Sequence, residues 1–138
     1  MGLRYLCIDL GDKRTGLASG DDVTRFVSPL LVLEIRRGPA LVDAAAKAVA
    51  THAPDALVIG LPLNMDGTEG DRAKIVRAFA AELEERTGLP VHLQDERLTS
   101  DAADAAMARS GRTHRQKKRL RDALAAAEIL RDYLDQNH

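Results

Sequence analysis

Residues 3–16 read LRYLCIDLGDKRTG, and this stretch determines the expected fold. The segment over residues 3–10 is mostly apolar and rich in strand-forming types, which predicts a buried β-strand. Asp9 directly follows Leu6-Cys7-Ile8, so its carboxylate ends a rigid, buried element. Burying such a charge is costly unless it is paired or bound to a metal. The alternative is an Asx-turn that begins the turn at Gly11.

The pattern around this strand predicts an α/β fold. Two further strands, residues 16–19 and 29–34, are separated by turn-forming residues 20–22 and continue an antiparallel meander. After residue 40, helical and strand-like periods alternate, which indicates parallel strands with crossover helices. The expected helices are residues 41–51, 71–86, 99–108 and 120–133, and the later strands are residues 56–59 and 91–94. The sum is a mixed five-stranded sheet flanked by helices.

Length and composition favour one globular domain over residues 1–138. The chain has 138 residues, of which 45% are hydrophobic and 30% charged. No apolar stretch approaches the roughly 20 residues that span a bilayer, and the N-terminus lacks signal-peptide features. Cys7 is the only cysteine, so it excludes an intramolecular disulfide and is expected to pack in the core. These features predict a cytoplasmic protein.

The net charge of −1 conceals an uneven distribution. Residues 105–121 carry seven basic side chains and no acidic one, which leaves 13 basic and 21 acidic residues elsewhere. Such a block is either a solvated segment or a contact for a phosphate backbone. Composition alone does not distinguish these two readings.

Three acidic or glycine-containing clusters follow predicted strands, at the edge where sites form in parallel sheets. Asp9 ends the first strand, residues 60–70 (GLPLNMDGTEG) follow the middle strand, and Glu96 follows the last. Asp122 lies near the start of the expected C-terminal helix. Taken singly, Glu96 could pair with a neighbouring arginine, and Asp122 could be an acid that favours a helix N-terminus.

Together, Asp9, Glu96 and Asp122 favour a metal site. Carboxylates brought together repel one another unless a cation neutralises them. Oxygen ligands without Cys or His fit Mg²⁺ or Mn²⁺, and the four histidines show no zinc-ligand spacing. Two such ions roughly 3.5–4 Å apart would activate water for phosphodiester hydrolysis. We therefore expect these three residues to be both the catalytic residues and the metal ligands.

Other chemistries lack their motifs. Residues 60–70 are not followed by the Gly-Lys-Ser/Thr of a P-loop, and no Gly-x-Ser-x-Gly elbow is present. The Asp-x-Gly of residues 9–11 also begins the phosphate-binding turn of sugar-kinase and actin-like ATPases. Those proteins close a second domain over the nucleotide, for which this chain has no room.

Four motifs in order resemble the YqgF family, also called RuvX, of pre-16S ribosomal RNA nucleases and Holliday junction resolvase-like proteins. They are IDLGDKRTGLAS (residues 8–19), VIGLPLNMDGTEGDRA (58–73), DERLTS (95–100) and RDALAAAEILRDYLD (121–135). Departures are modest: Ser100 stands where Thr is common, and Arg121 where an apolar residue often precedes the Asp. The resemblance implies a ribonuclease H-like fold with Asp9, Glu96 and Asp122 as the acidic triad. It also implies a bacterial cytoplasmic role in maturing the 5′ end of 16S rRNA.

The expected substrate contacts lie outside the triad. Arg14 and Arg97 would orient the carboxylates or bind the scissile phosphate, and the glycines of residues 64–70 would let the backbone approach closely. The basic stretch would bind flanking phosphates without sequence choice. The full set is Lys13, Arg14, Asn64, Gly67, Arg97, Arg112, Arg115, Lys117, Lys118 and Arg119.

Three functions stay open at this point. The first is an RNA nuclease of ribosome maturation, and the second is a DNA junction resolvase, which would need a symmetric dimer. The third is a nucleic-acid-binding assembly factor with vestigial catalysis. The expected partner is structured RNA or branched DNA rather than a membrane, and the chain is expected to be a monomer or a homodimer. RNA and DNA present the same phosphate chemistry, so the residues do not choose between them.

Overall fold

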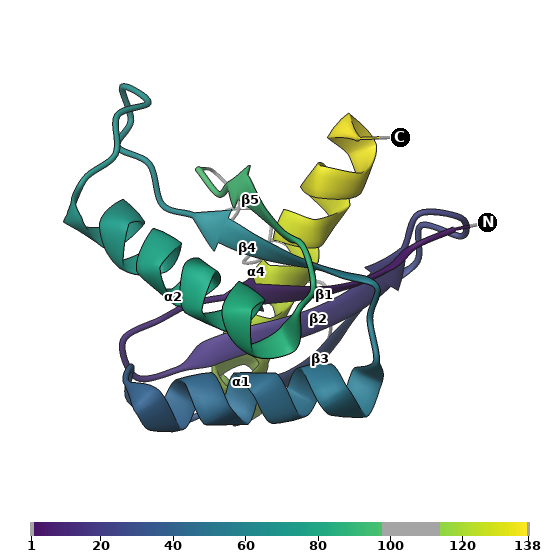
Figure 1. The fold of residues 1–138 in the computed structure, drawn as a ribbon, viewed down its shortest axis with the longest axis horizontal. Helices are drawn as coiled ribbons and strands as arrows, with labels where there is room; N and C mark the ends of the chain where they lie inside the picture. Colours follow the sequence, from purple (N-terminus) through teal and green to yellow (C-terminus); the bar gives the residue numbers. More distant parts are fainter. Residues whose placement is uncertain (1, 98–113, 138) are drawn as a thin grey trace.

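The computed structural model describes residues 2–97 and 114–137 (Figure 1). Five strands and three helices lie within these ranges. In chain order they are β1 (Arg4–Asp9), β2 (Thr15–Asp21), β3 (Val27–Leu33), α1 (Pro39–His52), β4 (Ala56–Leu61), α2 (Asp71–Thr87), β5 (Val91–Asp95) and α4 (His114–Gln136). The predicted helix over residues 99–108 lies outside the described residues.

The strands form one mixed sheet in the order β3-β2-β1-β4-β5. β1 pairs antiparallel with β2, and β2 pairs antiparallel with β3, which confirms the predicted meander. On its other side β1 pairs in parallel with β4, and β4 pairs in parallel with β5. β1 and β4 are therefore central strands, and the carboxyl ends of β1, β4 and β5 meet at one edge of the sheet.

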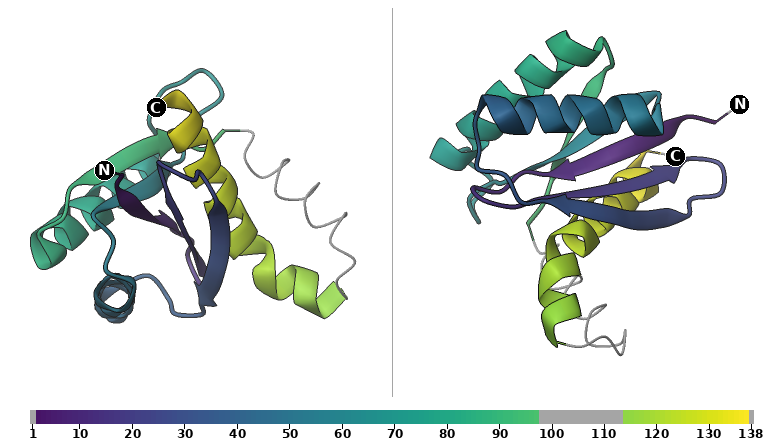
Figure 2. Two further views of the ribbon diagram at one scale, coloured as in Figure 1. Left: turned by 90° about the vertical axis from the view of Figure 1, so that its right-hand side faces the viewer. Right: turned by 90° about the horizontal axis from the view of Figure 1, so that it is seen from below.

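Helices cover both faces of the sheet (Figures 1 and 2). α1 and α2 lie side by side on one face, and α4 crosses the other. Along β1, Leu6 and Ile8 pack under α1 and α2, while Tyr5 and Cys7 pack under α4. β1 is thus buried on both faces, which explains why its sequence is an apolar run without a polar alternation. Cys7 is fully buried, as predicted.

The turn between β2 and β3 begins later than predicted. Residues 20–22 were expected to form it, whereas β2 continues through Gly20 to Asp21, which lies opposite Arg4 of β1. The Asp21 carboxylate accepts hydrogen bonds from the backbone N–H groups of Val23 (2.9 Å) and Thr24 (2.7 Å). Asp21 therefore starts an Asx-type turn, and pairing with the full length of β1 extends the strand past Gly20.

The C-terminal helix begins earlier than predicted. The apolar periodicity starts at Leu120, but α4 begins at His114 and includes the basic residues that follow it. Lys, Arg and Gln are good helix formers, so the helix includes residues that no apolar stripe marks in the sequence. Among the helices within the described ranges, none is long and apolar enough to cross a membrane.

Glycine at position 16 lets α4 approach the sheet closely. A β-carbon at Gly16 would lie 1.9 Å from the backbone oxygen of Asp122, far inside any allowed contact. Ala123 and Ala126, both fully buried, keep the neighbouring turn of α4 equally close to the strands. Gly16 lies directly opposite Asp9 in the sheet, so this contact also determines how near α4 comes to the end of β1.

We expect Gly16→Ala to destabilise the fold by about 1–3 kcal/mol, because the added methyl group forces α4 away from β2. Urea denaturation followed by circular dichroism measures the change. Gly70→Ala is the matched control, since a β-carbon there meets nothing nearer than 3.4 Å and its φ of −100° suits any residue. Equal stability of the two variants would contradict the close packing of α4.

Candidate active site

Asp9 ends β1 between two neighbouring strands, on the face covered by α4. Its side chain follows Tyr5 and Cys7 in the alternation of the strand, and both of these residues pack under α4. Burial raises the pKa of the Asp9 carboxyl well above its ordinary value, and the nearby charge of Glu96 raises it further. Asp9 is thus the strongly desolvated acid that the sequence predicted.

Glu96 lies directly beyond β5 and reaches across β4 to Asp9. Its backbone N–H donates to the carbonyl oxygen of Leu61 at 3.2 Å, which fixes the chain at the end of the strand pair. A β-carbon at Gly60 would lie 2.4 Å from Oε2 of Glu96, so glycine in β4 leaves room for this side chain where it lies. Burial raises the pKa of the Glu96 carboxyl, while its hydrogen bond with Asp9 lowers it.

Asp9 and Glu96 are in hydrogen-bond contact, which requires one proton between the two carboxyl groups, and burial raises the pKa of both. Two neighbouring carboxyl groups with little hydration do not both ionise unless a positive charge lies nearby, because their negative charges repel each other. The alternative reading of Glu96 as the partner of Arg14 or Arg97 is not what the structure shows.

Asp122 approaches the pair from α4. The backbone of Asp122 contacts Gly16, which lies directly opposite Asp9 in the sheet. The charge of Asp122 contributes to the raised pKa of Asp9. Nε of Arg14 lies 3.3 Å from Oδ2 of Asp122. Burial raises the pKa of Asp122, and the attraction of Arg14 opposes this. Because α4 begins at His114, Asp122 lies about two turns inside the helix and is not an N-terminal helix acid.

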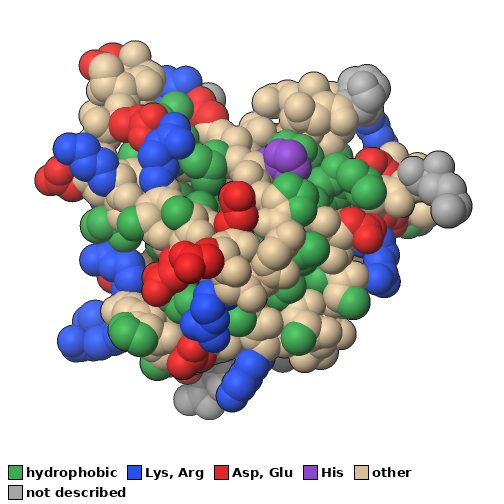
Figure 3. All heavy atoms as spheres, in the orientation of Figure 1, with side chains coloured by type: hydrophobic (Ala, Val, Ile, Leu, Met, Phe, Trp, Pro, Cys, Tyr) green, Lys and Arg blue, Asp and Glu red, His purple; other side chains and the backbone are tan. Residues whose placement is uncertain are grey.

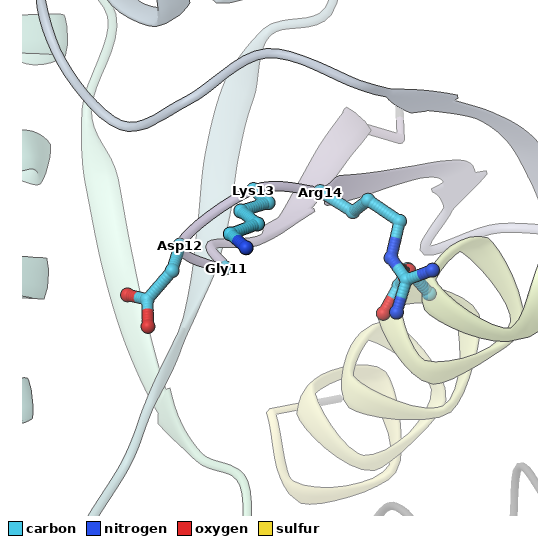
Figure 4. Close-up of a pocket in the computed structure, with 5 residues that line it drawn as sticks. Gly11, Asp12, Lys13 and Arg14 are labelled. Carbon is cyan, nitrogen blue, oxygen red and sulfur yellow. Dashed lines mark ion pairs between the residues drawn. The ribbon is translucent and has the colours of Figure 1, made fainter.

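A cavity of about 520 Å³ opens beside these acids. It is lined by Asp122 and by the β1–β2 loop, residues 11–14. Lys13 and Arg14, both predicted to contact substrate, lie on its wall, with Arg14 extended toward α4 and Asp12 pointing the opposite way (Figure 4). The loop is tightly built, since a β-carbon at Gly11 would lie 2.1 Å from the carbonyl oxygen of Arg14. Two basic side chains therefore border a hollow that Asp122 also lines.

The partners of the Arg97 guanidinium are Asp95 and the β4–α2 loop. The guanidinium donates to Asp95 through Nε (2.9 Å to Oδ2) and Nη2 (2.7 Å to Oδ2), and through Nη1 to the carbonyl oxygen of Met65 (3.0 Å). Asn64 and Gly67 lie in the same loop, where Gly67 has a φ of +88°. Arg97 thus connects the end of β5 to the β4–α2 loop.

The basic stretch is only partly described. Arg112 lies outside the described residues. Arg115, Lys117, Lys118 and Arg119 belong to the first turns of α4. Their role in binding phosphates stays a prediction.

Arg72, in the first turn of α2, was not singled out by the sequence. Its positive charge lowers the pKa of both Asp9 and Glu96. α2 begins where the β4–α2 loop ends, at the same edge of the sheet, so the position was in principle readable from the βαβ topology. Nothing in the spacing of residues, however, distinguishes Arg72 from other exposed helix arginines.

The donor set fits a hard divalent cation. Within residues 2–97 and 114–137, no three His, Cys, Asp or Glu side chains are gathered closely enough to hold an ion as they stand. Asp9 and Glu96 are in contact, however, and Asp122 is near enough to act on Asp9 electrostatically. Desolvated carboxylate oxygens that must share a proton are the groups that Mg²⁺ or Mn²⁺ would neutralise.

Comparisons with known proteins identify the family of the chain. The sequence pattern of the RuvX family, described as a Holliday junction resolvase, matches residues 3–136. A protein of Anaeromyxobacter sp. (strain Fw109-5), named "Putative pre-16S rRNA nuclease", is 44% identical over 99% of both chains. A protein of the same name from Paraburkholderia phymatum is 43% identical over 94% of this chain and 83% of its own.

Solved structures show the same fold at low identity. T. thermophilus RuvC in complex with a Holliday junction substrate has a TM-score of 0.60 at 15% identity, over 97% of this chain and 94% of its own. Fowlpox virus resolvase, also in complex with junction DNA, has a TM-score of 0.63 at 12% identity, over 97% and 98%. These likenesses confirm the predicted fold class.

We expect Asp9→Asn, with metal chelated, to stabilise the fold at pH 7 by more than about 0.5 kcal/mol. The Asn amide can donate to Glu96 as the protonated acid does. In the wild type the folded state keeps a proton that the unfolded chain releases, so its stability falls as pH rises above about 4, the unfolded pKa. The advantage of the variant should therefore vanish below that pH.

Urea denaturation between pH 4 and 8, in the presence of a chelator, measures this difference. Asp43→Asn is the control, since Asp43 is an exposed acid whose carboxylate pairs with Arg86 at 2.9 Å. A difference between Asp9→Asn and wild type that stays constant with pH would contradict the raised pKa.

Proposed function

The chain belongs to the RuvX Holliday junction resolvase family, and we propose that it is a metal-dependent nuclease that matures the 5′ end of pre-16S rRNA. The single observation that carries the catalytic part is the contact of Asp9 with Glu96 beside Asp122. These acids come from β1, the end of β5 and α4, which are far apart in the chain. Relatives named as pre-16S rRNA nucleases over nearly their whole length support the choice of RNA.

Asp9, Glu96 and Asp122 would hold the Mg²⁺ or Mn²⁺. Bound there, the cation would supply an activated water and neutralise charge on the leaving oxygen. The protein's own contribution is to reduce hydration around Asp9 and Glu96, to leave room for the Glu96 side chain at Gly60, and to hold the Glu96 backbone on the Leu61 carbonyl. A bound cation would lower the pKa of both carboxyl groups, so that the proton between them would be released to solvent.

Basic residues beside the cavity would position the phosphate backbone. Lys13 and Arg14 border the hollow that Asp122 also lines, and the basic first turns of α4 project beyond the sheet (Figure 2). On the α1–α2 face, described acidic and basic side chains are interspersed (Figure 3). A polyanion is therefore expected to bind at the carboxyl edge of the sheet and along α4, with its contacts mainly to phosphates.

A DNA junction resolvase is the second candidate, favoured by the description of the family and by the fold of the structural neighbours. Resolution requires paired cuts and hence a homodimer. An assembly factor that binds RNA without cutting it is the third candidate. We place the protein in the cytoplasm, because pre-rRNA maturation in bacteria takes place there.

One cleavage assay separates these candidates. Purified protein is incubated with an RNA that spans the 5′ end of pre-16S rRNA, with unstructured RNA, and with a four-way DNA junction, each with Mg²⁺, Mn²⁺ or chelator. We expect metal-dependent cleavage of the pre-rRNA, and Asp9→Asn, Glu96→Gln and Asp122→Asn should each lower kcat by about 10³-fold. Asp43→Asn should cleave at the wild-type rate.

Each other outcome has a clear meaning. Full activity of a folded Asp9→Asn variant would contradict the site. Paired cuts of the junction by a dimer would favour the resolvase, and tight RNA binding without any cleavage would favour the assembly factor.

Metal binding can be tested without activity. We expect Mn²⁺ at roughly 100-fold above its Kd to raise the Tm of the wild type by about 5 °C or more, because a ligand of the folded state stabilises it by mass action. Asp9→Asn should lose most of this rise, whereas Asp43→Asn should keep it. Differential scanning calorimetry measures the shift, and an equal rise in Asp9→Asn and wild type would place the ion elsewhere.

A further inference from the structure

The β4–α2 loop is a small, well-ordered hairpin. Leu63 pairs with Glu69 as an antiparallel bridge, and the backbone N–H of Asn64 donates to the carbonyl oxygen of Thr68 at 2.8 Å. The Asn64 side chain also donates to Thr68 Oγ1 at 2.9 Å, and the backbone N–H of Thr68 donates to Oδ1 of Asp66 at 3.0 Å. Gly67 supplies the positive φ that the turn requires. This short loop therefore holds its own shape.

Two arginines connect this hairpin to the rest of the protein. On one side, Arg97 donates to the Met65 carbonyl at 3.0 Å while it is held by Asp95. On the other side, Arg77 of α2 donates to both carboxylate oxygens of Glu69, at 2.6 and 2.8 Å. The hairpin projects past the end of the sheet beyond β4 (Figure 1). The hairpin is held on both sides and forms an arm at the edge of the sheet where Asp9 and Glu96 lie.

The arm presents an apolar side chain, Met65, that is 79% exposed. Single exposed apolar residues are common on surfaces, so exposure alone assigns nothing. The distinguishing feature of Met65 is its place, because its carbonyl is bound by the residue that follows Glu96. In the described part of the chain, the other large apolar side chains this exposed are Val23 and Phe26, in the β2–β3 hairpin at the opposite edge.

We propose that Met65 packs against a nucleobase of the substrate strand that passes the Asp9–Glu96 pair, entering between two bases that it unstacks. The proposal rests on the proposed nuclease function and adds a means of substrate choice. A flexible, polarisable Met side chain fits the π-face of any base, so the contact is tolerant of sequence. The contacts of the hairpin backbone keep Met65 at this edge of the sheet before substrate binds.

Such a wedge selects substrates by their stacking. Apolar side chains that enter base steps must overcome stacking energy, and the cost is least where a base is unpaired or mismatched. Met65 would therefore favour cleavage at branch points and at the ends of helices over cleavage within a continuous duplex. This provides structure selectivity in a chain whose basic contacts read only phosphates.

Fluorescence of 2-aminopurine tests the contact without cleavage, because this base brightens when it is unstacked. A synthetic RNA hairpin with a single-stranded 5′ extension carries the probe at successive positions, and protein is added with a chelator. For wild type we expect a rise of about threefold or more at one position at the helix end, since unstacking relieves quenching of the probe. Met65→Ala should lose the rise and Met65→Leu should keep it.

Phe26→Ala is the matched control, since Phe26 is also 79% exposed but lies at the opposite edge. It should behave as wild type, and all variants should keep the wild-type Tm. Wild-type binding with no brightening, or equal brightening by Met65→Ala, would overturn the wedge while leaving the nuclease intact. If wild-type protein binds the hairpin and cleaves no nucleic acid in metal, the nuclease proposal fails even where the wedge is seen. Failure to bind any probe overturns both.

Discussion

Two partly buried carboxyl groups in contact, Asp9 and Glu96, are the constraint around which this edge of the sheet is built. Their mutual repulsion and their loss of hydration both oppose folding, so the surrounding structure has to hold them together. The parallel pairing of β1, β4 and β5 does this, since it brings the end of β1 and the end of β5 to either side of β4. Gly60 of β4 then leaves the path across which Glu96 reaches Asp9.

The opposite approach, from α4, depends on the same kind of close packing. Gly16 lies opposite Asp9 and admits the backbone of Asp122, so a missing side chain in β2 places the third acid. Gly60 and Gly16 thus lie in the two strands on either side of β1. Because neither has a side chain, Gly60 leaves room for Glu96 and Gly16 leaves room for the backbone of Asp122. The acids are far apart in sequence, and the glycines that bring them together are as important to the site as the acids.

The strands and helices could be predicted from the sequence because the burial of each element leaves a pattern in its own residues. The apolar runs of β1 and β4 and the helical period of α2 reflect burial on both faces or on one, which periodicity reports. It misjudged the start of α4, where helix-forming basic residues carry no apolar stripe. It could not anticipate that Arg97 binds Asp95 and the Met65 carbonyl, or that Arg72 acts on the acidic pair. Those contacts depend on side-chain directions at the edge of the sheet, which spacing does not encode.

The three acids differ in how rigidly the structure positions them, and this difference suits the binding of a cation. Asp9 ends the central strand β1, and the Glu96 backbone is held on the Leu61 carbonyl directly after β5, so the backbones of both acids are fixed by the sheet. Asp122 is held by Arg14 at 3.3 Å, with 49% of the Arg14 side chain exposed. Partly exposed ion pairs of this kind contribute about 0–1 kcal/mol, so the carboxylate of Asp122 can exchange Arg14 for a divalent ion at little cost. Arg14, once released, stays on the wall of the cavity where a phosphate would lie. In the proposed site, a rigid pair with one adjustable third acid would couple binding of the metal to release of Arg14, which would then be available to a phosphate.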